Sequence, residues 1–258
     1  IIGRWFKKNP DQRRNVVLAT KMAGTMDGLS PNHCGLSRGN IMESVYASLE
    51  RLQTDHIDLL YFHRFDGITP PEESLEAIED LVKQDLIRYF AVSNASVDIL
   101  KTYQTVQSSL SVRSRILAVQ NQFDLLDGES AEDKGVLDYA SEKGISFIGW
   151  SPMARGLLTN RYLNPVVAGP GDRLFDEGDL KDKTSKENMK KLHALAAISD
   201  EMGVELSQLV MAYMLTIKGM GPIIPSSSSV KQLESNAAAG KLILTNEQIA
   251  RVRNIVNY

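Results

Sequence analysis

The sequence has little cysteine and no long apolar run, and each shortage excludes a class of protein. The single cysteine, Cys34, excludes an internal disulfide and favours a reducing compartment, so we expect a cytoplasmic location. Cys34 follows His33 in a polar stretch without further ligands nearby, which predicts a surface thiol and no metal site. No apolar stretch approaches the roughly 20 residues that cross a bilayer, so we expect no membrane partner.

The charges are nearly balanced, with 29 Lys and Arg against 32 Asp and Glu and a net charge of -3. This balance argues against a dominant basic surface, so we expect no nucleic-acid partner. Hydrophobic residues make up 43% of the 258 residues, which is typical of an ordinary globular protein. The length suits one large α/β domain as well as two small ones, and the sequence is silent on oligomeric state.

Short apolar or β-branched runs alternate with longer segments of helical period. One such segment carries Ile41, Val45, Leu49 and Leu52 at helical spacing, which predicts one buried helix face. The six runs that predict strands are residues 15–20, 56–62, 87–92, 116–120, 145–150 and 221–225.

Residues that commonly begin or end helices stand at positions that agree with this alternation. Ser96 is placed to cap a helix, and Thr245 with Gln248 forms the pattern of a capping box. Gly144 and Gly203 stand where helices should end.

The alternation predicts the α/β class, in which parallel strands are covered by crossover helices. An open doubly wound sheet and a (β/α)₈ TIM barrel both satisfy it. Polar residues follow or close all six strand runs, and a barrel collects such carboxyl ends around one mouth, so we favour the barrel. These residues are Lys21, His63, Ser93 with Asn94, Gln120, Ser151 and Ser226.

Six strands supply about six of the eight βα units that such a barrel needs, so we expect the barrel to be incomplete in this chain and two strands to precede Ile1. We treat residues 1–258 as a single domain of this kind. Residues 155 to 185 interrupt the alternation of strands and helices with a Gly-Pro-Gly-Asp stretch and a charged run. This interruption predicts a long surface loop beside the mouth of the barrel or a tolerated insertion.

Lys21 and His63 close neighbouring strand runs and could face a common pocket. A desolvated lysine can hold an anion or take part in proton transfer, and a histidine can orient a carbonyl. Each residue alone is equally well explained as an ordinary polar residue at a solvated strand end. A catalytic role for the pair is therefore supported only by the residues around it.

The order and spacing of six segments resemble the aldo-keto reductase superfamily from the first residues to about Asn236. The segments are NVVLATK (15–21), SLERLQTDHIDLLYFHRFD (48–66), IRYFAVSN (87–94), ILAVQNQFDLL (116–126), GWSPMARGLL (149–158) and PIIPSSSSVKQLESN (222–236). The resemblance implies an eight-stranded barrel that binds a nicotinamide dinucleotide and reduces a small aldehyde or ketone to an alcohol. The sequence accordingly lacks the G-x-G-x-x-G fingerprint of Rossmann domains.

The resemblance also implies roles for individual residues. Lys21 and His63 match the catalytic lysine and histidine of the family. Residues matching the cofactor-binding positions are Ser93, Asn94 and Gln120 for the nicotinamide carboxamide, Trp150 for the nicotinamide ring, Ser151, Pro152, Met153, Ala154, Gly156 and Leu157 for the pyrophosphate, and Ser226, Ser228, Gln232 and Asn236 for the adenosine end.

The sequence departs from the family pattern at two places. Many members carry arginine where this chain has Gln232, so we name Arg161 and Lys231 as alternative partners for a 2′-phosphate, and prefer NADP (NADPH) over NAD on family grounds. The family also carries an aspartate and a general-acid tyrosine just before the counterpart of IIGRWFKK. The alternative is therefore a catalytically impaired dinucleotide-binding subunit with a regulatory or redox-sensing role, and a third possibility is a partner chain that supplies the missing strands.

Overall fold

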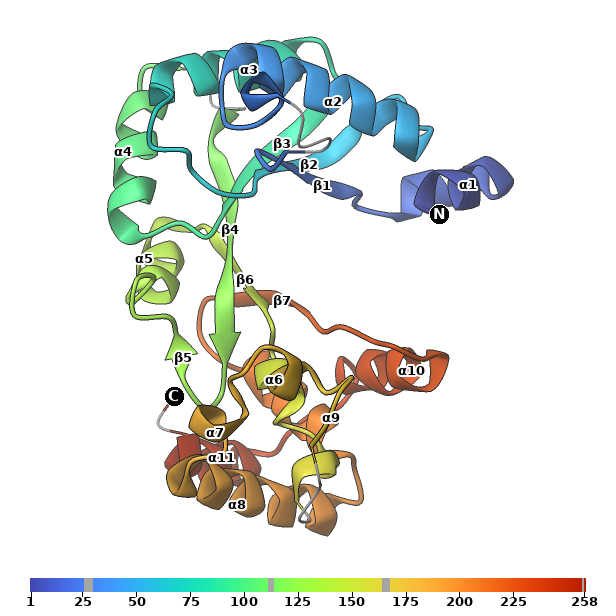
Figure 1. The fold of residues 1–258 in the computed structure, drawn as a ribbon, viewed down its shortest axis with the longest axis vertical. Coiled ribbons are helices and arrows are strands. Elements are labelled where there is room, and N and C mark those ends of the chain that lie inside the picture. The colour runs from blue at the N-terminus through green and yellow to red at the C-terminus, as the bar shows by residue number, and fades with distance from the viewer. Residues whose placement is uncertain (26–29, 111–113, 164–167, 257) are drawn as a thin grey trace. The chain divides into compact units, whose positions relative to one another are not determined.

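The computed structural model describes residues 1–25, 30–110, 114–163, 168–256 and 258. Strands and helices alternate along the chain, which confirms the α/β class (Figure 1). The strands are β1 (Ala19–Met22), β2 (Ile57–Phe62), β3 (Ile87–Ser93), β4 (Ile116–Asp124), β5 (Gly128–Glu129), β6 (Ser146–Trp150) and β7 (Met220–Ile224).

Helices of very different length connect these strands. The α-helices are α1 (Ile2–Lys8), α2 (Arg38–Leu52), α3 (Pro71–Lys83), α4 (Val97–Gln107), α5 (Val136–Lys143), α6 (Arg173–Asp176), α7 (Leu180–Lys183), α8 (Lys186–Met202), α9 (Leu206–Met214), α10 (Val230–Ala239) and α11 (Asn246–Val256). The 3₁₀ turns are η1 (Pro10–Asn15), η2 (Pro31–His33), η4 (Ala154–Gly156) and η5 (Asn160–Tyr162). Among the described residues, no helix is both long and apolar enough to cross a membrane.

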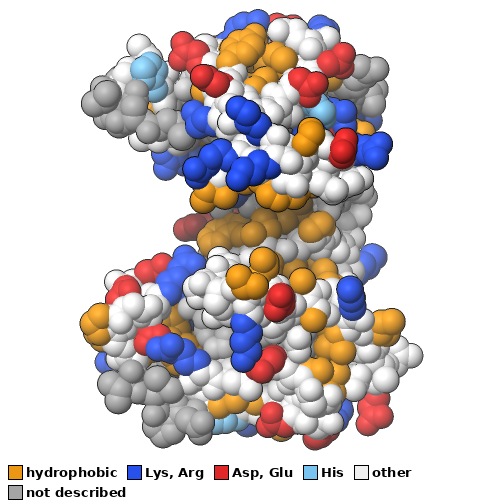
Figure 2. Space-filling model, turned by 90° about the vertical axis from the view of Figure 1, so that its right-hand side faces the viewer, with side chains coloured by type: hydrophobic (Ala, Val, Ile, Leu, Met, Phe, Trp, Pro, Cys, Tyr) orange, Lys and Arg blue, Asp and Glu red, His pale blue; other side chains and the backbone are white. Residues whose placement is uncertain are grey.

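The chain forms two compact units. Unit 1 comprises residues 1–120 and 132–146, and unit 2 comprises residues 121–131 and 147–258. Basic, acidic and hydrophobic side chains all occur on the surface of each unit on the face shown in Figure 2, as expected from the small net charge.

Unit 1 is built on parallel strands in the order β1-β2-β3-β4. All six residues of β2 are buried, as expected for a parallel strand covered on both faces. Helix α3 contacts α2, α4 and β3, and Figure 1 shows α2 and α3 side by side over the strands of this unit. Leu75, Ile78 and Leu81 of α3 are fully buried, and burial of each contributes about 1.5–3 kcal/mol.

Unit 2 combines the parallel pair β6–β7 with a cluster of helices. Helix α9 contacts α8, α10 and β7, while α11 packs on α8. Leu209, Val210 and Met214 of α9 are fully buried, so this helix forms the centre of the unit. The end of β4 pairs with the two-residue strand β5 in an antiparallel hairpin.

The six predicted strands are present, but the first is shifted along the chain. The sequence predicts residues 15–20, whereas η1 continues to Asn15 and β1 begins at Ala19. The backbone N–H of Leu18 donates to the Asp58 carboxylate at 2.9 Å, so a side chain provides a partner just before the strand begins. Val17 is correspondingly exposed although it is β-branched.

The predicted helix boundaries are confirmed where capping residues marked them. The Ser96 hydroxyl accepts from the Ile99 N–H, and Thr245 and Gln248 exchange hydrogen bonds as a capping box. Gly144 and Gly203 end α5 and α8 in the left-handed conformation. Residues 155 to 185 contain η5, α6 and α7 in addition to loop, because helices of three or four residues leave no periodic pattern in a sequence.

At Gly3, helix α1 lies close to the backbone at the end of α2. A Cβ atom at Gly3 would lie 2.2 Å from the carbonyl oxygen of Arg51 and 2.9 Å from the carbonyl carbon of Leu52, at the end of α2. Both atoms belong to the backbone, so neither can rotate away. Gly39, near the start of α2, meets no atom within 4 Å.

We therefore expect Gly3→Ala to destabilise unit 1 by about 1–3 kcal/mol, since α1 must move away from α2. The matched substitution Gly39→Ala should instead be neutral or stabilise the protein by up to about 1 kcal/mol, because alanine favours the helix. Urea unfolding of both variants measures the difference. An unchanged midpoint for Gly3→Ala would show that α1 does not pack at this distance.

Candidate functional site

Five predicted site residues of unit 1 form one connected polar cluster at the carboxyl ends of β1 to β3 and in the middle of β4, which continues to Asp124 although the sequence predicts its end at Gln120. Lys21 lies in β1 and Gln120 in β4, and the Lys21 ammonium donates to the Gln120 side-chain oxygen at 2.5 Å. The Ser93 hydroxyl, at the end of β3, donates to the Gln120 carbonyl oxygen at 2.8 Å. The parallel register places these residues together, because Ser93 pairs with Gln120 and Lys21 with Tyr61.

Asn94 completes the cluster from the residue after β3. Its backbone adopts the left-handed region with φ of +52°, where asparagine is better tolerated than most residues. The side-chain amide donates to the His63 carbonyl oxygen at 2.8 Å and to the Ser93 hydroxyl at 3.3 Å. Asn94 thereby links the end of β2 to the end of β3.

Lys21 is a half-buried cation without a carboxylate partner among the described residues. Burial lowers the pKa of Lys21 below its ordinary value, because the charged form is poorly solvated. The ammonium also lies 5.9 Å from the centroid of the Tyr61 ring, which offers a weak cation–π contact. A lysine in this state can place positive charge next to a developing anion or exchange a proton.

His63 follows β2, and its backbone N–H donates to the Met22 carbonyl oxygen at 2.8 Å. The pKa of His63 is lowered by partial burial first and then by the positive charges of Lys21 and Arg64. Since the ordinary value is 6.5, the lowered pKa keeps the imidazole neutral at pH 7. A neutral imidazole can donate one hydrogen bond to a carbonyl oxygen while it carries no charge.

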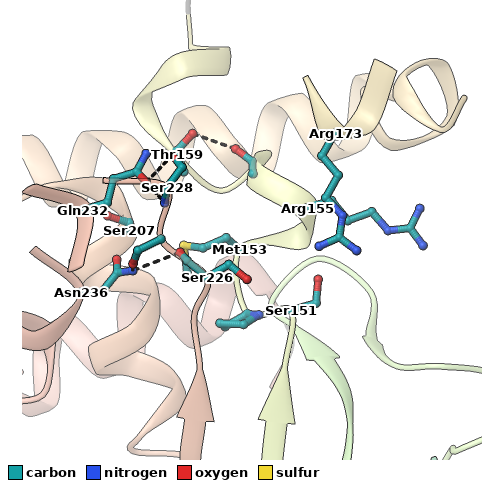
Figure 3. A pocket seen from close by; sticks show the side chains of 13 residues that line it. Ser151, Met153, Arg155, Thr159, Arg173, Ser207, Ser226, Ser228, Gln232 and Asn236 are labelled. Carbon is teal, nitrogen blue, oxygen red and sulfur yellow. Dashed lines mark hydrogen bonds between the residues drawn. The ribbon is translucent and has the colours of Figure 1, made fainter. Parts of the chain in front are cut away.

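A cavity of about 350 Å³ in unit 2 contains most of the residues predicted for the phosphates and the adenosine end. Figure 3 shows Arg155 and Arg173 on one side and a polar group on the other, made up of Ser207, Ser226, Ser228, Gln232 and Asn236. The lining residues are Ser151, Pro152, Met153, Arg155, Gly156, Thr159, Arg173, Ser207, Ser226, Ser227, Ser228, Gln232 and Asn236.

The segment after β6 reaches this cavity through a strained backbone. Ser151, Ala154 and Arg155 all have positive φ angles, at 64°, 46° and 57°, although none of them is glycine. Such residues cost about 1–3 kcal/mol each and cluster at ligand-binding sites. Packing offsets the strain, because Ala154 and Leu157 are buried and hold the turn in place.

The serine-rich side of the cavity is organised by the start of α10. The Ser229 hydroxyl caps this helix by accepting from the Gln232 N–H at 3.2 Å. The Gln232 side-chain oxygen accepts from both the N–H and the hydroxyl of Ser228, at 2.7 and 2.9 Å. Asn236 donates to the Ser227 hydroxyl at 2.9 Å, so this side presents neutral hydroxyl and amide groups.

The opposite side of the cavity carries positive charge. Arg155 pairs with Glu177 at 3.0 Å and also with Asp179, while Arg173 pairs with Glu177 at 2.7 Å. The two arginines are the charged residues that line the cavity. An anionic group bound here would compete with Glu177 and Asp179 for these guanidinium groups.

The structure separates the predicted residues into those that reach the cavity and those that do not. Trp150, Ala154, Leu157 and Arg161 do not line it, and Arg161 forms an ion pair with Asp172 at 2.6 Å. Trp150 is half-buried at the end of β6, where it pairs with Ile224 of β7. Sequence reasoning missed Thr159, Arg173 and Ser207, which lie outside the quoted motifs, whereas Arg155 and Ser227 lie inside two of them.

No metal-binding site is visible in the part of the chain that the structure describes. No group of three or more His, Cys, Asp or Glu side chains there is arranged to hold a metal ion. Two candidate sites result, each described by itself: a cluster of a lysine, a neutral histidine and amide groups in unit 1, and a cavity lined by hydroxyl groups, amides and two arginines in unit 2.

Comparison with known proteins identifies the class to which this fold and these residues belong. The model of the Aldo/keto reductase family matches residues 1–257, so the chain belongs to that family. It is 31% identical to Aldo-keto reductase AMT2 of Alternaria alternata, over 86% of this chain and 59% of that protein. It is 32% identical to Aldo-keto reductase str7 of Strobilurus tenacellus, over 99% of this chain and 72% of that protein.

A second group of relatives carries a different description. The chain is 28% identical to a probable voltage-gated potassium channel subunit beta of Oryza sativa subsp. japonica, over 99% of this chain and 78% of that protein. A protein of the same description from Arabidopsis thaliana is also 28% identical, over 94% of this chain. The chain thus spans between about three fifths and four fifths of the length of these four relatives.

We expect the substitution Lys21→Met to raise the pKa of His63 towards its ordinary value of 6.5, because it removes the lysine charge that opposes protonation. An NMR titration of the His63 ring protons measures the pKa in both proteins. Lys83→Met is the matched control, since Lys83 is exposed on α3 and pairs with Glu79. An unchanged His63 pKa in Lys21→Met would show that the two side chains do not interact.

Proposed function

We propose that the protein is an oxidoreductase that reduces a small aldehyde or ketone to an alcohol, with NADPH as the hydride donor. The observation that carries the proposal is the pair formed by partly buried Lys21 and neutral His63 at the ends of adjoining parallel strands, in a chain of the aldo/keto reductase family.

The residues present suit a nicotinamide dinucleotide. Ser93 and Gln120 offer hydroxyl and amide groups for a carboxamide, and both are buried, so such hydrogen bonds would be shielded from water. Arg155 and Arg173, with the strained turn between β6 and η5, offer positive charge for phosphate groups. When bound, the dinucleotide supplies the hydride that reduces the carbonyl carbon.

The side chains of unit 1 act on the carbonyl oxygen. His63 donates a hydrogen bond that orients the carbonyl, and the Lys21 ammonium stabilises the negative charge that develops on the oxygen. The oxygen must also gain a proton. Tyr61 is unsuited to give it, since it is only 2% exposed and burial raises its pKa. By resemblance to the family, we assign this proton to a tyrosine that precedes the segment matching IIGRWFKK.

The cofactor preference depends on positive charge near a 2′-phosphate. Arg161 is paired with Asp172, and neither it nor Lys231 lines the cavity, so the two alternatives named from sequence are less suited. Arg173 lines the cavity and is paired with one exposed carboxylate, that of Glu177. We therefore assign Arg173 to the 2′-phosphate of NADPH, with NAD as the alternative cofactor.

A second candidate function is a regulatory or redox-sensing subunit that binds a dinucleotide without turnover. Two relatives described as probable voltage-gated potassium channel subunits beta favour it. In either case we propose that residues 1–258 belong to one domain and that the protein is cytoplasmic, as its single cysteine suggests.

If the protein is a reductase, Lys21→Met and His63→Ala should each lower kcat/KM for an aldehyde by about 10²–10⁴-fold. Steady-state oxidation of NADPH with a panel of aldehydes and ketones measures this effect. Lys83→Met again serves as the control and should keep full activity. Tight dinucleotide binding by the wild-type protein without any turnover would contradict the reductase proposal and favour the regulatory subunit.

The substitution Arg173→Ala should weaken NADPH binding by about tenfold or more and leave NADH binding nearly unchanged, because only NADPH carries the 2′-phosphate. Quenching of nicotinamide fluorescence, measured at fixed ionic strength, gives both dissociation constants. Arg251→Ala is the control, since Arg251 pairs with Glu201 on the same unit and does not line the cavity. Equal losses for both cofactors would place the contact of Arg173 at the pyrophosphate.

A further inference from the structure

A cluster of charged side chains lies at the amino end of β2, away from the polar cluster described above. One carboxylate oxygen of Asp58 lies 2.7 Å from a guanidinium nitrogen of Arg13. The other lies 3.0 Å from Arg88 and 3.7 Å from the ring Nε2 of His56. The Asp58 side chain is 9% exposed, so these contacts are largely shielded from water. A single carboxylate therefore connects η1, the start of β2 and the start of β3.

The Asp58 carboxylate also binds the backbone just before β1. The Leu18 N–H donates to it at 2.9 Å. The Leu18 carbonyl oxygen accepts in turn from the N–H groups of Asp58 and Leu59, at 3.0 and 3.1 Å. Both polar backbone groups of Leu18 are thus held by the first residues of β2. Because β1 begins at the next residue and pairs with β2 in parallel, this contact fixes where β1 starts along β2.

Asp58 is a strong acceptor because its carboxylate is ionised. Burial by itself raises the pKa of Asp58, but the hydrogen bond from Leu18 and the bond and charge of Arg13 outweigh it, so the pKa lies below its ordinary value of 3.8. An ionised carboxylate accepts shorter and stronger hydrogen bonds than a neutral amide does. The substitution Asp58→Asn therefore weakens the hold on Leu18 while it nearly preserves the size of the side chain.

We propose that Asp58 is a positioning residue for Lys21, which acts through the alignment of β1 on β2. The two residues do not touch, since Lys21 follows Leu18 by three residues, or roughly 10 Å along the strand. Asp58 holds Leu18 at the start of β1, and the register of β1 then places Lys21 opposite Tyr61. The effect on catalysis rests on the proposed function, whereas the placement of Lys21 can be tested without cofactor.

His63 can report where Lys21 lies, because burial and then the charge of Lys21 lower the pKa of His63. We expect Asp58→Asn to displace Lys21 and so to raise the pKa of His63 towards its ordinary value of 6.5, by less than Lys21→Met does. A direct effect of Asp58 has the opposite sign, since loss of its negative charge would lower the pKa of His63. It would also act over roughly 16 Å, at the strand rise of about 3.3 Å per residue, and is screened by salt.

The first experiment is an NMR titration of the His63 ring protons in wild type, Asp58→Asn, Lys21→Met and the double variant. We expect the double variant to match Lys21→Met, because it has no lysine charge left to move. Asp80→Asn is the matched control, since Asp80 forms an exposed ion pair with Arg38. An unchanged or lowered His63 pKa in Asp58→Asn would overturn the proposal, and so would an equal rise with and without Lys21.

Hydrogen exchange in the wild-type protein tests the hold on Leu18 without any substitution that could impair folding. The Leu18 amide should be protected at pH 7 although it lies before β1, because it donates to Asp58. The amide of Val17, whose side chain is exposed, is the reference and should exchange faster. Equal exchange rates for Leu18 and Val17 would show that the carboxylate does not hold the start of β1, and would overturn the proposal.

Steady-state kinetics separates failure of this inference from failure of the proposed function. Asp58→Asn should lower kcat for an aldehyde by about tenfold or more, as expected when a catalytic group is misplaced by ~1 Å, and leave the KM for NADPH nearly unchanged. In the Lys21→Met protein, it should cause no further loss of kcat. If wild type shows no turnover, the proposed function fails, while the His63 titration still decides the role of Asp58. If wild type turns over and Asp58→Asn keeps full kcat, the proposed function stands and the positioning role is overturned.

Discussion

The parallel register of β1 to β4 is the constraint on which the catalytic half of the site depends. Strand β2 is buried along its whole length and pairs in parallel with both β1 and β3, so it sets the position of each neighbour. That register brings Lys21 opposite Tyr61 and Ser93 opposite Gln120. The position of the polar cluster therefore depends on how the buried strands of unit 1 pair with one another.

The polar cluster of unit 1 and the cavity of unit 2 carry their positive charge in opposite ways. In unit 1, Lys21 is partly desolvated and held by the neutral Gln120, so its charge is available to a reacting oxygen. In unit 2, Arg155 and Arg173 are neutralised by Glu177 and Asp179 until an anion replaces those carboxylates. The first arrangement suits a chemical step, and the second suits reversible binding of phosphate groups.

Much of the fold could be predicted because its signals are local or periodic. Buried strands appear as apolar runs, and residues such as Ser96 and Gly203 mark helix ends by their own conformational preferences. The start of β1 could not be predicted, since it depends on the carboxylate of Asp58, which is 40 residues away from Leu18. The strand β5 and the helices α6 and α7 are too short to leave a pattern.

The site was partly predictable for the same reason. Residues at strand ends could be found from strand positions, whereas Arg173 and Ser207 come from a short helix and from the first turn of α9, where nothing local marks them. The contact between Lys21 and Gln120 spans 99 residues and could not be inferred from spacing. Only the folded register shows that the lysine and the glutamine share one hydrogen bond.

The distinction between an enzyme and a binding subunit lies in the proton donor and in the state of Lys21. Dinucleotide binding calls for buried amide groups and for cations, and the described residues include both. Hydride transfer in addition needs a proton for the carbonyl oxygen, which neutral His63 and buried Tyr61 are poorly suited to supply. A partly buried lysine is useful in either role, because it can assist proton transfer in a reductase or place positive charge beside a bound ligand in a regulatory subunit. The same lysine therefore allows both functions, and the proton donor decides between them.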